Sequence, residues 1–215
     1  MNGKKYELTT ETKVVFGRTL YRIRALVAFG DVWAGELGGW IEKESNLAQD
    51  GNAWISGNAW ICGDARISGN ARIYGDAWIS GNAWISGNAR ISGNAWIYGN
   101  ARISGNAWIS GNAWISGNAR ISGNAWIYGN ARITGNAEIS KPSHLLTIGA
   151  IGSRYAVTTF FRAKNKKIYV NCGCFFGAIA EFAEQVKQTH GDSKHGKTYA
   201  LAIKLAKAQI EDVEE

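Results

Sequence analysis

A six-residue alternation of apolar and polar positions, Gly-Asn-Ala-Trp/Arg-Ile-Ser/Tyr, runs from Gly51 to Ser140 in fifteen copies without an insertion. Alternate side chains of a strand point to opposite sides. The Ala and Ile positions never vary, so they predict a buried side, and the Trp/Arg and Ser/Tyr positions predict an outer side. Gly and Asn tolerate positive φ and suit a tight corner. The pattern therefore predicts short strands, separated by corners, around an interior of Ala and Ile.

A strand of four residues cannot bury its apolar side alone, but stacked coils can, because each coil pairs with the coils above and below it. Three copies would form one triangular coil of 18 residues. The fifteen copies then predict a prism of five coils, roughly 24 Å long at about 4.8 Å per coil. Residues that are 18 positions apart are expected to lie above one another on the same face.

Each predicted face carries a column of outer side chains. The first column is Trp60, Trp78, Trp96, Trp114 and Arg132. The second is Trp54, Arg72, Arg90, Trp108 and Trp126. The third is Arg66, Trp84, Arg102, Arg120 and Glu138.

Rings and guanidinium groups at this spacing can stack on one another, which would stiffen the prism without any partner. A column of four Trp is also large enough to form an apolar patch of the kind that binds a partner. Trp and Arg are enriched at interface hot spots. We therefore predict an interface that uses Trp60, Trp78, Trp96, Trp114, Arg132, Arg66, Arg102 and Arg120.

An aliphatic residue followed four positions later by a small one, as in Ile55 and Ala59, resembles the hexapeptide signature of left-handed parallel β-helices. The resemblance covers all fifteen copies and implies a mainly β fold, a left-handed β-helix of five to six triangular coils. It also implies acyl transfer from a coenzyme A or carrier-protein thioester as the family's commonest activity, although other members are not catalytic. The lead-in GGWIE at 38–42, followed by NLAQDGNAW at 46–54, is similar to uncharacterised bacterial and phage proteins, some of them labelled hexapeptide transferases.

Acyltransferases of this kind use a His as general base, because the acceptor needs a group that titrates near neutral pH. The fifteen copies contain no His, and all three His residues of the chain follow them. His144, just after Lys141 and Pro142, is the candidate base, and its alternative is a structural role at a junction. We expect no enzymatic activity and no cofactor.

Both ends depart from the repeat. Residues 1–44 are predicted to form an N-terminal β cap with strands at 13–16 and 20–26, and residues 45–142 form the β-helix. Residues 143–215 predict a small α+β domain with a hairpin of strands 157–162 and 167–172. Helices follow at 178–188 and 198–211. The first is expected to bury Ile179, Phe182, Ala183 and Val186, and the second Leu201, Ile203 or Lys204, Leu205 and Ala208.

The spacing of Cys172 and Cys174, followed by His190 and His195, approximates a two-Cys, two-His zinc site. A gap of one residue is tighter than usual, and a strand would place both thiols on one side. The alternative is that the cysteines are small apolar residues and that the histidines lie in a polar turn, and we favour no metal. The same segment resembles a tail of other phage-type proteins at Cys172, Gly173, Cys174, Phe175, His190, Gly191 and Tyr199.

The amino-acid composition argues against several classes of protein. The chain has 27 Gly and 1 Pro, which argues against collagen-like and Pro-rich chains, and 46% hydrophobic residues, which argues against disorder. No apolar run is long enough for a membrane helix, and the start lacks a secretory pattern, so we expect a cytoplasmic protein with reduced cysteines. The net charge of +7 permits a nucleic-acid partner and argues against an acidic mimic of nucleic acid.

Residues 75–104 match residues 105–134 at all but two positions, which indicates a tandem duplication of a 30-residue segment. Because 30 is not a multiple of 18, the duplication moves the outer pattern to different faces and leaves the interior unchanged. We predict a non-enzymatic scaffold that self-associates as a trimer or dimer and presents its C-terminal domain to a protein partner. The alternatives are a coenzyme A-dependent acyltransferase and a phage-type protein that binds nucleic acid or a host factor.

Overall fold

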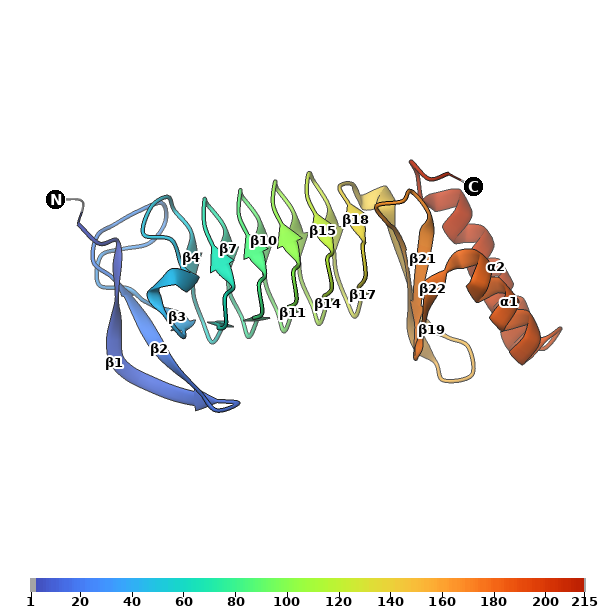
Figure 1. Cartoon of the computed structure of the whole chain (residues 1–215), viewed down its shortest axis with the longest axis horizontal. Coiled ribbons are helices and arrows are strands. Elements are labelled where there is room, and N and C mark those ends of the chain that lie inside the picture. Colours follow the sequence, from blue (N-terminus) through green and yellow to red (C-terminus); the bar gives the residue numbers. More distant parts are fainter. Residues whose placement is uncertain (1–2, 215) are drawn as a thin grey trace.

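The computed structural model describes residues 3–214. A β-solenoid occupies the middle of the molecule, between a hairpin at its N-terminal end and a sheet with two helices at its C-terminal end (Figure 1). The fold is mainly β, as the repeat predicts.

Fifteen strands of two residues form the solenoid, each made of the Trp, Arg or Glu position and the Ile that follows it. They are β4 (Trp54–Ile55), β5 (Trp60–Ile61), β6 (Arg66–Ile67), β7 (Arg72–Ile73), β8 (Trp78–Ile79), β9 (Trp84–Ile85), β10 (Arg90–Ile91), β11 (Trp96–Ile97), β12 (Arg102–Ile103), β13 (Trp108–Ile109), β14 (Trp114–Ile115), β15 (Arg120–Ile121), β16 (Trp126–Ile127), β17 (Arg132–Ile133) and β18 (Glu138–Ile139). Each strand from β4 to β15 pairs in parallel with the strand three copies later, for example Trp96 with Trp114. The predicted stacking of residues 18 positions apart is confirmed.

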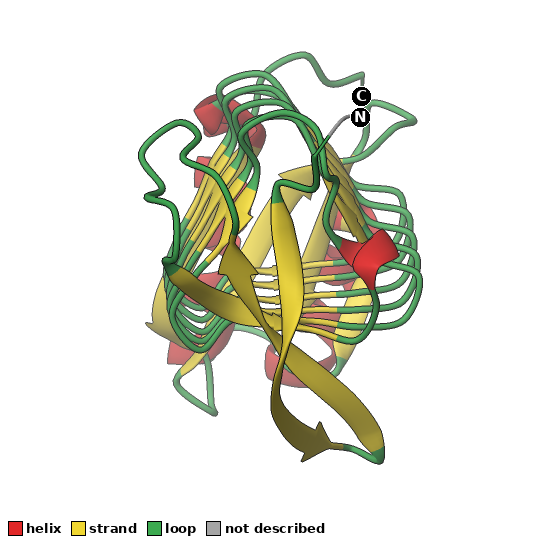
Figure 2. Ribbon diagram, turned by 90° about the vertical axis from the view of Figure 1, so that its left-hand side faces the viewer, coloured by secondary structure: helices red, strands yellow, loops and turns green. Residues whose placement is uncertain are grey.

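Three sheets result, in the orders β3-β5-β8-β11-β14-β17, β4-β7-β10-β13-β16 and β6-β9-β12-β15-β18. The view along the solenoid shows them as the sides of a triangle (Figure 2). With β3 (Leu37–Ile41) included, the solenoid has about six turns, because β3 adds a rung below β5.

The interior is the predicted one: every Ala and Ile of the repeats is at most 1% exposed. The corners need glycine for two reasons. Gly111 has a φ of +74°, and a Cβ placed on it would lie 2.8 Å from the carbonyl oxygen of Gly129 in the next coil. Successive corners therefore approach so closely that only a hydrogen atom fits between them.

The N-terminal cap is built on β1 (Tyr6–Val15) and β2 (Arg18–Ala25), which form an antiparallel hairpin that continues the first sheet through β3. Side chains from this region occupy the open edge of the first coil. The Lys5 ammonium donates to the Ala53 carbonyl (3.0 Å), and the Asn46 amide donates to the Ala65 carbonyl (2.9 Å). An open edge exposes unpaired backbone groups, and these side chains satisfy the exposed carbonyls.

The cap corrects one expectation about the second column. Trp54 is 3% exposed and does not form an outer rung, because Phe29 and Tyr6 of the cap pack against its ring with centroids 5.4 and 6.4 Å away. The repeat pattern places Trp54 on the outer side of the coil, and the cap then covers that side.

The C-terminal region contains a four-stranded antiparallel sheet, β19 (Leu145–Ile151), β20 (Ala156–Arg162), β21 (Ile168–Cys172) and β22 (Phe175–Ala178). The predicted hairpin corresponds to β20 and β21, and β19 and β22 are strands that the sequence analysis missed. The helices are α1 (Ile179–His190) and α2 (Lys194–Gln209). No helix within residues 3–214 has the length and hydropathy that crossing a bilayer requires.

The buried face of α2 differs from the predicted one. The side chains of Leu201 and Leu205 are 66% and 51% exposed, and Ala208 is exposed as well. Helix α2 buries the predicted Ile203 together with Tyr199, Ala202 and Ala206. The small Ala side chains allow a close approach to the sheet, and the Tyr199 ring packs edge-on against Phe182 of α1.

Strand β20 joins the two parts of the molecule. Phe161 is fully buried in the same cluster as the Ala and Ile interior and closes the C-terminal end of the solenoid, whereas its neighbour Phe160 packs with the helices. The hydroxyl of Thr159 accepts a hydrogen bond from the backbone N–H of Arg132 in the last coil (3.1 Å). The C-terminal sheet is thus the second cap of the solenoid.

Candidate interaction surface

A continuous row of aromatic rings runs along one face of the solenoid. We call it the aromatic row, and its rings are Trp60, Phe16, Trp78, Trp96, Trp114 and Tyr98. Neighbouring Trp rings on successive coils have centroids between 4.5 and 5.4 Å apart. The guanidinium of Arg132 ends the row, 5.7 Å from the centroid of the Trp114 ring. The predicted stacking is found between Trp60 and Trp78, whose ring planes differ by 8°, whereas Trp78 and Trp96 meet edge to face at 68° and Trp96 and Trp114 are tilted by 47°.

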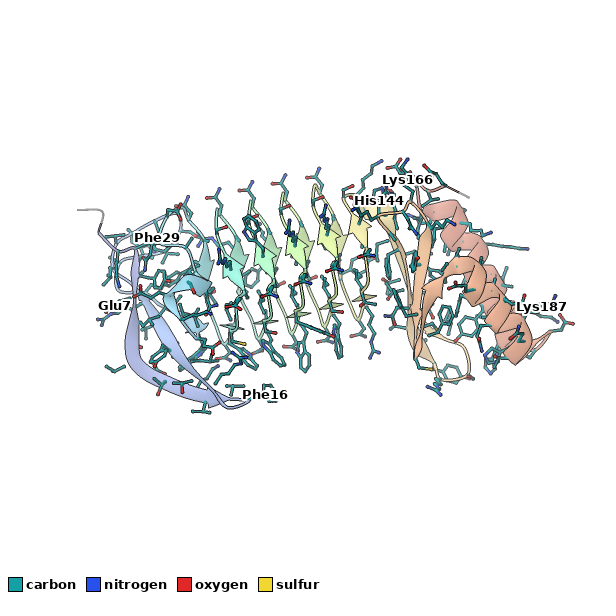
Figure 3. The ribbon with its side chains drawn as sticks, viewed as in Figure 1. Glu7, Phe16, Phe29, His144, Lys166 and Lys187 are labelled. Atoms are coloured by element: carbon teal, nitrogen blue, oxygen red, sulfur yellow. The ribbon has the colours of Figure 1, made fainter. Side chains whose placement is uncertain are left out.

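The N-terminal hairpin covers only one end of this row. Phe16 lies in the turn between β1 and β2 (Figure 3). Its ring stacks on Trp60 and Trp78, with centroids 5.9 and 5.1 Å away. These two Trp rings are half-buried, whereas Trp96 and Trp114 are 41% and 37% exposed. The row therefore has a covered end next to the hairpin and an open end next to the C-terminal region.

The second column is divided by the cap. Arg72 forms an ion pair with Asp31 of the cap. Trp108 and Trp126 lie further along and stack on each other at 5.5 Å, and both are exposed.

The third column is exposed except at Glu138, which is partly buried and paired with Arg162. Arg66, Arg102 and Arg120 are exposed, and half of the Trp84 side chain is exposed between them. The eight predicted interface residues thus lie on two faces, with Trp60, Trp78, Trp96, Trp114 and Arg132 on one and Arg66, Arg102 and Arg120 on the other.

His144, the candidate base, lies at the junction between the last coil and the C-terminal region (Figure 3). It is 2% exposed. Its Nδ1 accepts from the backbone N–H of Ser140 (3.3 Å), and its Nε2 lies 3.0 Å from the carboxylate of Asp212. A substrate has no access to a ring buried in this way, so the geometry is that of a junction histidine.

The Asp212 carboxylate joins this junction to Lys141, whose ammonium is 2.7 Å away. Hydrogen bonds from Lys141 first, and then from His144, lower the pKa of Asp212 to about 2. The carboxylate therefore stays charged over a wide pH range and holds the C-terminal segment against the end of the solenoid.

The expected placement of Cys172 and Cys174 on one side of a strand is wrong. Strand β21 ends at Cys172, Gly173 adopts a φ of +61° in the turn, and β22 begins at Phe175. Cys174 is exposed at the turn and Cys172 is partly buried. Throughout residues 3–214, no three His, Cys, Asp or Glu side chains gather in a way that could hold a metal ion.

Cys172 instead meets Tyr199, a residue to which the sequence analysis gave no role. The Cys172 thiol accepts a hydrogen bond from the Thr158 hydroxyl (3.2 Å) and lies 3.5 Å from the Tyr199 hydroxyl. Burial, followed by the contact with Cys172, raises the pKa of Tyr199. The His190 ring packs against the Tyr199 ring, with centroids 5.7 Å apart.

The Cys-Gly-Cys-Phe, His-Gly and Tyr motif therefore converges on one place, although its members are spread over 28 positions from Cys172 to Tyr199. The cavity there is about 210 Å³, smaller than the ~300–1,000 Å³ of typical ligand pockets. The motif thus packs the helices against the sheet.

Comparison with known proteins identifies the repeat. The model of the YdcK beta solenoid repeat matches residues 65–81, 83–99, 95–111, 101–117, 113–127 and 125–140. The repeats are β-solenoid repeats. A curated protein of Escherichia coli (strain K12), named uncharacterized acetyltransferase YdcK, is 56% identical over 36 residues. That similarity covers 17% of this chain and 11% of the relative, so the chain spans about a tenth of the relative's length.

Proposed function

We propose that this protein is a non-enzymatic scaffold. Its rigid solenoid self-associates through the open end of the aromatic row and holds the C-terminal domain at a fixed distance, where a protein partner binds it. The observation that carries the proposal is the division of the aromatic row into a covered and an open end.

The covered end of the row supports this proposal, because it shows an apolar segment of the same chain packed on two of the rings. An apolar hairpin tip lies on Trp60 and Trp78. The aromatic surface continues over Trp96 and Trp114, which are 41% and 37% exposed and on which Phe16 does not stack. Val14 and Phe16 on the hairpin itself are 71% and 75% exposed. Large exposed aromatic patches favour an interface, and Trp is the residue most typical of its energetic centre.

A second copy of the chain is the proposed occupant, in a dimer or trimer. Every copy carries both the open rings and the exposed hairpin tip, so a self-complementary contact needs no further component. The partner of the C-terminal domain would use Leu201 and Leu205, which lie four residues apart on the outer side of α2 and are 66% and 51% exposed.

The name of the E. coli relative supports acyl transfer as the alternative. Two features of this chain favour the scaffold instead. The fifteen copies run without an insertion that could wall a substrate site, and both ring nitrogens of His144 have partners within the junction.

Calorimetric titration with acetyl-coenzyme A distinguishes the two functions. If the protein is a scaffold, the titration should give no saturable heat. A cooperative thermal transition of the same sample shows that the protein is folded. Saturable binding in the micromolar range would overturn the non-enzymatic assignment. His144→Gln, tested in parallel, would then show whether the histidine takes part in that binding.

A further inference from the structure

The third column of the solenoid carries a line of positive charge with one aromatic ring inside it. Arg66, Trp84, Arg102 and Arg120 occupy the outer positions of β6, β9, β12 and β15, which pair in parallel register. Paired strands are about 4.8 Å apart, so these side chains form a straight track. We call these four residues the cationic column. The guanidinium of Arg102 lies 6.0 Å from the centroid of the Trp84 ring.

The charge of this column is not neutralised by the chain itself. Within residues 3–214, the three arginines of the column take part in no ion pair, whereas Arg72 pairs with Asp31 and Arg162 pairs with Glu138. Glu138 continues the column, but its carboxylate is held by Arg162 at 2.9 Å. Asp64, which lies near Arg66 in the sequence, is paired with Lys43.

A polar groove of about 460 Å³ lies beside Arg102 and Arg120. Asn100, Asn118 and Lys164 also line it. The Asn side chains form a ladder in which each amide nitrogen donates to the amide oxygen of the next coil, at 3.0 Å from Asn100 to Asn118. The groove therefore offers cations and amides, repeated from coil to coil.

We propose that this face binds single-stranded nucleic acid without sequence preference. The phosphodiester backbone would lie in the groove against Arg102, Arg120 and Lys164, and a base would stack on the exposed face of Trp84. A positively charged track with an aromatic platform is the arrangement that binds single strands, because every base has a π face. Bases in a duplex are already stacked on one another and are not available to Trp84.

The Trp84 ring favours nucleic acid over an acidic protein as the partner of the cationic column. An acidic peptide needs only the cations, whereas a nucleic acid also uses the ring held between them. The contribution of Trp84 therefore separates the two kinds of partner. The site lies on a different face from the aromatic row, so it can operate whether or not the chain self-associates.

The test is the binding of a fluorescently labelled oligo-dT strand to the full chain, measured by anisotropy over a range of salt concentrations. Three neutralised phosphates predict a slope of log K against log[salt] of about −2. Arg102→Gln with Arg120→Gln should weaken binding about 10-fold or more and reduce the slope by about 1.4. The matched control is Arg90→Gln with Arg154→Gln, which removes the same charge at two exposed positions outside this column and should change binding little.

Trp84→Ala should weaken binding of the strand about 5-fold or more, and Trp108→Ala should not. Equal losses in the two double arginine variants would overturn the proposal, since they indicate attraction to net charge only. Poly-glutamate binding as tightly as oligo-dT, with no effect of Trp84→Ala on either, would overturn it in favour of an acidic protein. Thermal melting of each variant checks that these exposed substitutions leave the fold intact.

Discussion

Phe16 stacks on Trp78 with ring centroids 5.1 Å apart and ring planes inclined by 19°. The two residues come from different parts of the fold, a hairpin turn of the N-terminal cap and a rung of the solenoid. Their contact holds the hairpin turn on the aromatic row, in addition to the pairing of β2 with β3, and covers the end of the row next to the cap.

Replacing Phe16 by Ala should release the hairpin tip from the row. We expect the free energy of unfolding to fall by about 0.5–1.5 kcal/mol, the usual contribution of an aromatic pair, and Trp fluorescence to move to longer wavelength as Trp60 and Trp78 become hydrated. Urea titration followed by fluorescence measures both effects. Phe16→Tyr should restore the wild-type values. An Ala variant with unchanged emission would show that the tip does not cover the row.

The corner glycines offer a matched pair. Gly111 and Gly129 both have positive φ, +74° and +67°, so Ala at either position should cost about 1–2 kcal/mol from the backbone alone. A Cβ on Gly111 would also meet the backbone of Gly129, whereas a Cβ on Gly129 has no atom within 4 Å. Gly111→Ala should therefore destabilise the protein by at least about 1 kcal/mol more than Gly129→Ala. Equal midpoints in urea would argue against such close packing of the coils.

Asp212 should make stability depend on acid pH. Its pKa in the folded protein, about 2, lies below the ordinary value of about 3.9 for an aspartate. A lowered pKa means that the carboxylate stabilises the fold fully above the ordinary value, and that this contribution is lost as the pH falls from about 4 through 2. Asp212→Asn should lower the melting temperature at pH 7, and the difference from wild type should shrink toward pH 2.

Melting curves of both proteins between pH 2 and pH 7 measure this difference. The neighbouring Glu211→Gln serves as the control, because the Glu211 carboxylate is 3.8 Å from the Lys141 ammonium rather than 2.7 Å. A difference between wild type and Asp212→Asn that stays constant down to pH 2 would contradict the proposed role of the carboxylate at the junction.

The interior of the solenoid could be predicted from the sequence, because inward and outward positions follow from the alternation within each copy. Residues such as Ala95 and Ile97 lie inside for a purely local reason. Whether an outer side chain is covered depends instead on segments that are distant in the sequence. Trp54 and Trp126 have the same place in the repeat, yet Trp54 is 3% exposed under the cap and Trp126 is 49% exposed.

The C-terminal region shows a second limit. Counting apolar side chains selected Leu201 and Leu205 as the buried face of α2, whereas the sheet and α1 accept the smaller Ala202 and Ala206 together with Tyr199. The geometry of the sheet and of α1 determines which face of α2 is buried. The sequence of α2 alone does not give that geometry. The turn at Gly173 has a local signal, because a glycine lies between two short apolar runs directly after the predicted strand 167–172.

The most direct measurement of the scaffold function is sedimentation velocity of the full chain over a range of concentrations. A mass above the 23.4 kDa of one chain, which falls on dilution, is the predicted result. Trp96→Ser with Trp114→Ser should give a monomer, and Trp108→Ser with Trp126→Ser, which changes a stacked pair on another face, should leave the assembly intact. A wild-type chain that stays at 23.4 kDa throughout the micromolar range would contradict self-association through the aromatic row.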